Sequence, residues 1–75
     1  MREKIIEALV LKYKGAIAES QANIEIYLTN SAGIGEHPEV LQAIDTQIEK
    51  IAEAEDKLLV LENHFQEDNP KTLVE

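Results

Sequence analysis

The chain has 75 residues, no cysteine and a formal net charge of −8 at pH 7, so it makes one domain at most and has neither disulfides nor zinc–thiolate sites to stabilise it. Residues 36–75 carry eleven of the 15 acidic residues but three of the seven basic ones, and such an acidic half repels phosphate, so we expect no nucleic acid or anionic membrane as a partner. No long uncharged apolar run follows the N-terminal Met-Arg-Glu-Lys, which predicts neither a signal peptide nor a membrane span.

The first predicted element is a helix at about 2–30 that is apolar on two opposite sides. At about 100° per residue, one broad stripe contains Ile5, Ile6, Leu9, Val10, Tyr13, Ala16, Ile17, Ile24, Tyr27 and Leu28. The opposite side contains Ala8, Leu11, Gly15, Ala18, Ala22 and Ile26. A helix that is apolar nearly all round is usually buried nearly all round, but the rest of this short chain is long enough to cover only one side. We therefore predict that the second set is an oligomer interface.

Gly15 supports this prediction, because glycine inside a helix costs about 1 kcal/mol relative to alanine. A glycine at such a position usually has a packing reason. Its neighbours on this side of the helix are small residues, so the expected reason is the close approach of another helix.

A break is expected at residues 30–37, where Gly33 and Gly35 allow a change of chain direction. Pro38 then suits the first position of a second helix, predicted at about 38–65. Its apolar stripe is predicted to contain Val40, Leu41, Ile44, Ile48, Ile51, Ala52, Leu58, Leu59 and Phe65. Pro70 prevents the helix from continuing, and we expect residues 67–75 to form a frayed tail.

Two long helices joined by a short loop predict an all-α fold, an antiparallel αα-hairpin over residues 1–66. If the turn centres near Ile34, facing residues have numbers that sum to about 68, so that Ile24 faces Ile44 and Tyr13 faces Glu55. With its second apolar side, the first helix should pair with its copy. The sequence therefore predicts a homodimeric four-helix bundle.

Catalytic and metal-binding chemistry finds little support in the residue pattern. A di-metal site in a helical bundle needs inward glutamates and a Glu-x-x-His pair, whereas Leu61 stands three residues before His64. No serine or threonine has a histidine that the sequence places as its base. We therefore predict no catalytic residue, no metal and no cofactor, and a protein that is not an enzyme.

The loop and the second helix carry a resemblance. The stretch Ser-Ala-Gly-Ile-Gly-Glu-His-Pro-Glu-Val at 31–40 precedes a helix with Ile-Glu-Lys-Ile-Ala at 48–52 and Leu-Glu-Asn-His-Phe at 61–65. Over residues 1–65 the chain resembles a group of small uncharacterised proteins from marine bacteriophage genomes. That group has no assigned activity. The resemblance implies a phage accessory or assembly-related protein in the cytoplasm of an infected bacterium.

The sequence thus favours a small acidic helical protein that acts through protein–protein interaction, with itself and with an unidentified host or phage protein. One alternative is an acidic decoy of nucleic acid that occupies a basic groove on a host protein. Lys50 and Lys57 interrupt the acidic side of the second helix and so weigh against it. Another alternative is a helical subunit of a larger enzyme or virion.

Overall fold

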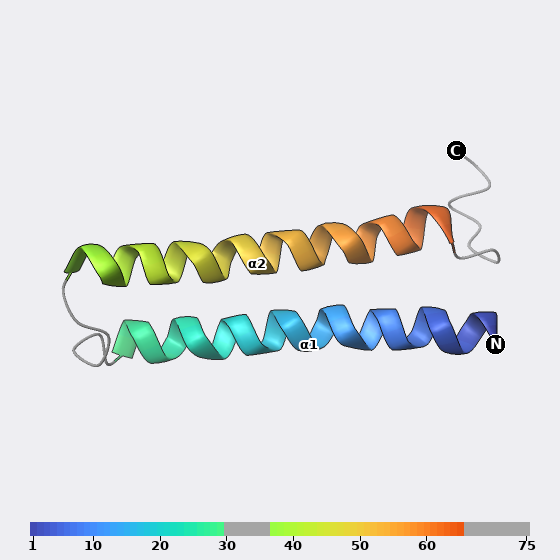
Figure 1. Cartoon of the computed structure of the whole chain (residues 1–75), viewed down its shortest axis with the longest axis horizontal. Coiled ribbons are helices and arrows are strands. Elements are labelled where there is room, and N and C mark those ends of the chain that lie inside the picture. The colour runs from blue at the N-terminus through green and yellow to red at the C-terminus, as the bar shows by residue number, and fades with distance from the viewer. Residues whose placement is uncertain (30–36, 66–75) are drawn as a thin grey trace.

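The computed structural model describes residues 1–29 and 37–65, which form two α-helices. α1 spans Arg2–Thr29 and α2 spans His37–His64. They run in opposite directions and pack against each other along their length, so that the start of α1 lies beside the end of α2 (Figure 1). The expected all-α pair of long helices is confirmed. Apart from His37, the loop predicted at 30–37 lies outside the described residues, and so does the tail predicted at 67–75.

The hairpin is a single layer of helices. Its extents are 49 × 26 × 14 Å, and the shortest of these leaves room for one helix, which is about 10–12 Å across with its side chains. Most domains bury their apolar residues between two packed layers. Here each described helix covers the other on one side, and both broad faces of the pair are open.

The contact between the helices, which we call the seam, recurs at seven-residue spacing. Its central positions are at least half-buried and comprise Ile6, Tyr13, Ser20 and Tyr27 on α1 and Val40, Gln47, Ala54 and Leu61 on α2. Rows on either side of the α1 positions, such as Ile17 and Ala16, are also partly covered. This alternation of three and four residues is the spacing of helices that cross at a shallow angle.

Two contacts across the seam establish the register. The Asn23 Nδ2 atom donates a hydrogen bond of 3.3 Å to Gln47 Oε1, and the Lys57 ammonium lies 5.5 Å from the centroid of the Tyr13 ring. The paired residue numbers sum to within two of the expected 68, so the register is confirmed to within about half a helical turn. The expected pairing of Tyr13 with Glu55 is wrong, however. Glu55 is exposed, because the residue before it is the one that enters the seam.

The middle of the seam is polar. Ser20 is the most buried residue described, at 2% exposed, and Gln47 is buried near it. No buried side-chain nitrogen or oxygen in the described ranges lacks a hydrogen-bond partner. Sliding one helix by seven residues would separate the amides of Asn23 and Gln47. Because a buried amide without a partner is costly, this polar level favours the observed register.

The rotation of α2 about its own axis differs from the expectation. The sequence placed its larger apolar side chains against α1, but Leu41, Ile48, Leu59 and Phe65 are all exposed. Val40, Ile44, Ile51 and Leu58 of the expected stripe are partly buried, as predicted. Ala43, Gln47, Ala54 and Leu61, which lie outside that stripe, enter the seam beside them. The apolar stripe of α2 is therefore turned to one side of the contact that α2 makes with α1.

Candidate interaction surfaces

The outer side of α1, opposite α2, carries the six residues predicted as an oligomer interface. We call Ala8, Leu11, Gly15, Ala18, Ala22 and Ile26 the α1 outer surface. All six are exposed, including Leu11 at 62% and Ile26 at 55%. The structure thus leaves them on one unoccupied side of the hairpin. That a second copy covers this surface stays a prediction.

Gly15 has open space around it within this chain. A Cβ atom built there would meet nothing within 4 Å outside the helix's own backbone and nearest neighbours. No close approach by α2 explains the glycine, because α2 lies on the other side of α1. If Gly15 serves packing, its partner therefore comes from outside the described residues, and a second copy of the chain is the partner that the sequence predicts.

A second set of apolar residues lies exposed beside the seam. Leu28 at the end of α1 is 63% exposed, and Leu41 and Ile48 on α2 are 74% and 51% exposed. We call these three, together with the half-buried Ile17, Ile24, Ile44 and Ile51 next to the seam, the apolar broad face. The sequence predicts all seven on the inside of the hairpin; the four half-buried residues lie next to the seam, whereas Leu28, Leu41 and Ile48 are exposed instead. The signal that could have predicted their exposure is their position on α2 beside Gln47 and Ala54. Two neighbouring rows of α2 can face α1, and only one of them can lie at the centre of the seam.

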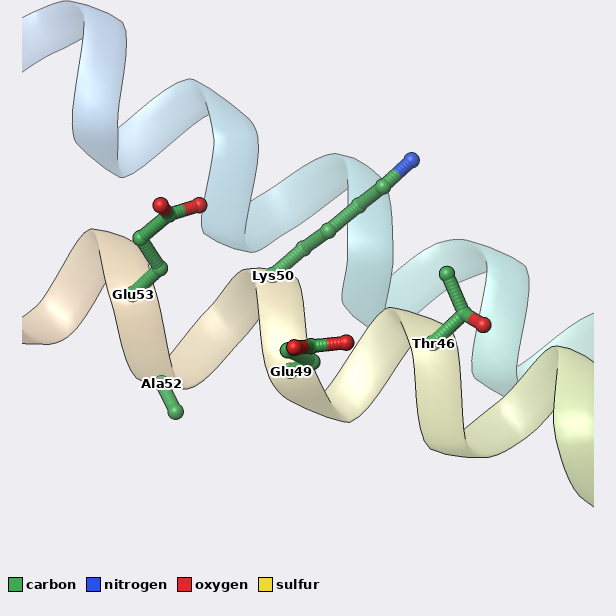
Figure 2. Close-up of a pocket in the computed structure, with 5 residues that line it drawn as sticks. All are labelled: Thr46, Glu49, Lys50, Ala52 and Glu53. Carbon is green, nitrogen blue, oxygen red and sulfur yellow. The ribbon is translucent and has the colours of Figure 1, made fainter.

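The side of α2 that faces away from the apolar broad face is acidic, but a lysine lies among its acidic residues. A hollow there is lined by Thr46, Glu49, Lys50, Ala52 and Glu53, and Figure 2 shows the Lys50 side chain extending away from the two glutamates. All five lining residues come from α2, so the hollow lies along the surface of one helix. A site that encloses a small ligand needs groups that converge from several directions. These residues therefore form a mixed-charge surface rather than an enclosed site.

Metal binding and membrane crossing each need a particular grouping of residues, which the described helices do not have. Within 1–29 and 37–65, no group of three or more histidine, aspartate or glutamate side chains lies close enough to hold a metal ion. Neither α1 nor α2 has an apolar stretch of the length and low charge that spanning a bilayer requires.

The ends of the hairpin are tied by a backbone contact. The Arg2 Nη2 atom donates a hydrogen bond of 2.6 Å to the carbonyl oxygen of Phe65. At the loop end of α1, the Thr29 hydroxyl donates to the carbonyl oxygen of Glu25 at 2.8 Å. Both bonds are exposed to solvent, so they position the helix ends without creating a pocket.

Comparisons with protein-family models, with curated protein sequences and with solved structures give no match to this chain. The fold and its surfaces are therefore the basis for any functional argument.

Proposed function

We propose that this chain is a non-enzymatic, acidic helical hairpin that acts by binding other protein chains, and first a second copy of itself. One observation carries the proposal. Among the described residues, the buried apolar side chains are Ala54 and Leu61 alone, while ten large apolar side chains are at least 41% exposed. A soluble monomer rarely exposes so much apolar surface in contiguous strips. Association removes that surface from water.

The α1 outer surface is the first place where two copies meet. Its small residues allow two α1 helices to approach closely, and one self-complementary patch is enough for a two-fold dimer. In this arrangement the α1 helices lie inside, and the acidic sides of the α2 helices face solvent. The resulting four-helix bundle keeps the net charge of each copy at its surface, where charge favours solubility.

In biological terms, we propose a phage accessory or assembly-related factor in the bacterial cytoplasm, and the resemblance over residues 1–65 supports this role. A helical subunit of a larger enzyme or virion is the second candidate, since another protein's helix would fit the α1 outer surface as well. The acidic decoy has weaker support. Lys50 stands among the acidic residues of α2, and Lys57 lies over a tyrosine ring beside the seam.

The test is the mass of the purified chain in solution, measured by sedimentation over a concentration series. We expect the wild type at micromolar concentration to have at least twice the 8.4 kDa of one chain. Ala18→Glu should weaken association at least roughly tenfold, because it places a carboxylate in an apolar contact. Glu53→Ala, on the exposed side of α2, is the matched control and should change nothing. A well-folded wild-type monomer at this concentration would refute the proposal.

A further inference from the structure

The rotation of α2 leaves an apolar strip that its own hairpin does not use. Gln47 is buried in the seam, and Ile48 follows it by one position, about 100° further round the helix. Leu41 stands seven residues earlier, in the same relation to Val40. Both side chains are more than half exposed. The strip therefore points out of the plane of the hairpin rather than towards α1.

Leu28 of α1 lies on the same side of the hairpin as this strip. It follows Tyr27, a central seam residue, just as Ile48 follows Gln47. In two antiparallel right-handed helices, residues one position after the facing rows turn to the same broad face, because the helices wind in opposite senses when viewed from one end. The register places Leu28 at the level of Leu41. Both helices thus contribute to one apolar area near the loop end.

Half-buried residues join these exposed ones into a continuous surface. Ile24 and Ile44 lie between the exposed side chains and the centre of the seam, and both remain partly accessible. On the other broad face, the corresponding positions of α2, one before the central seam residues, are Thr46, Glu53 and Val60, all exposed. Near the loop end, the two sides of α2 therefore differ in polarity, whereas towards the other end Glu55 and Glu62 are exposed on the apolar side and Val60 on the opposite side.

We propose that the apolar broad face binds the same face of a second copy of this chain, as an association surface distinct from the α1 outer surface. Two facts favour a second hairpin as the occupant. The hairpin is one layer, 14 Å in its shortest extent, and an equal layer would complete the usual two-layer core. Two packed 28-residue helices also present a face about 42 Å long and about 20 Å wide, close to the roughly 800 Å² per partner of a stable interface, in which the apolar broad face would be the hydrophobic part and the half with Lys14, Glu55 and Glu62 the polar part.

This inference rests on the proposed self-association and names a surface through which two copies associate. The first test compares two lysine variants of α2 by sedimentation. Ile48→Lys should weaken association at least roughly tenfold, because it places an ammonium group in the apolar contact. Thr46→Lys lies two positions earlier on the opposite broad face and should leave association unchanged. Circular dichroism at high concentration verifies that both variants remain helical.

A second measurement does not depend on a destabilising charge. The chain has no cysteine, so Ile48→Cys and Thr46→Cys each introduce a single thiol. Their rates of reaction with a water-soluble thiol reagent are measured at concentrations above and below the association midpoint. We expect the Ile48→Cys thiol to react at least roughly tenfold more slowly in the associated form, and the Thr46→Cys thiol to react at similar rates in both.

Each outcome bears on one proposal or on both. A wild-type oligomer that Ile48→Lys leaves intact, with the Ile48→Cys thiol equally reactive at all concentrations, would overturn this inference and leave the proposed self-association standing. If the Ile48→Cys thiol reacted slowly in the dilute monomer, residues of the same chain would be covering it, and this would also overturn the inference. A folded wild-type monomer would overturn both. Concentration-dependent protection at position 48 alone, with loss of mass in Ile48→Lys, is the expected result.

Discussion

The two helices have the same length but use their apolar residues differently. α1 spreads them around its circumference, whereas α2 gathers them on one side. α1 buries part of its set against α2 and leaves the α1 outer surface open. α2 turns Leu41, Ile48 and Leu59 to the side and buries Gln47, Ala54 and Leu61 at the seam. The comparison shows that the apolar stripe of a helix and its contact stripe need not coincide when a chain folds as one layer.

A physical reason for the rotation of α2 lies in side-chain size. The register puts residues 54–57 opposite the bulky Tyr13, and Ala54 is the small residue of that stretch. At the next level, the central residues of the seam are the small Ser20 and the longer Gln47. Alternating large and small residues across a contact lets helices pack closely without cavities. Turning Leu41 and Ile48 inward would remove this match at both levels.

The largest expected effect tests which leucines of α2 face α1. Leu61→Ala removes a buried side chain from the seam and should lower the free energy of unfolding by about 2 kcal/mol or more. Leu59→Ala, two residues away and half exposed, should cost about 1 kcal/mol or less. Both are measured by urea unfolding at one fixed chain concentration, since association shifts apparent stability. If both variants lost the same free energy of unfolding, α2 would have to present a different side to α1.

An intermediate effect tests the outer side of α1 through its glycine. Gly15→Ala should stabilise the helix by about 1 kcal/mol, because the added methyl group has open space within the chain. If two α1 helices meet closely there, the same methyl group should weaken association. Unfolding of the dilute chain and sedimentation of the concentrated chain separate the two effects. Greater stability without any change in association would remove Gly15 from the oligomer interface.

The smallest effect tests the contact between Tyr13 and Lys57. Lys57→Met keeps the length of the side chain but removes the charge over the ring, and should cost about 0.5 kcal/mol. Tyr13→Phe keeps an aromatic face and should cost less than that. Both are read from the urea midpoint. If Tyr13→Phe lowered the free energy of unfolding by more than about 1 kcal/mol, the Tyr13 hydroxyl would have to make a stabilising hydrogen bond in the folded protein.

Much of the fold follows from local features of the sequence. Helix formation over 2–29 and from 37 onward depends on periodic apolar residues and on the break marked by the glycines and Pro38. The antiparallel direction follows from the short connection between helices of equal length. The register follows too, because a short loop leaves little freedom to slide, and the contacts at Gln47 and Lys57 agree with it to within half a turn. The α1 outer surface was also foreseeable, since six apolar or small residues on one side need no tertiary information to recognise.

The tertiary structure alone decided how each helix turns about its axis. Helical periodicity identifies an apolar side of about 100° or more, but a two-helix contact is narrower than that, so packing selects one row within it. For α2 the selected row contains Gln47, which bonds to Asn23 across the seam, and Ala54. Leu41 and Ile48 are excluded from the seam by that choice and exposed with Leu28 on one broad face. Their surface exists because the fit between individual side chains, a property of both helices together, outweighed the hydrophobicity of either one.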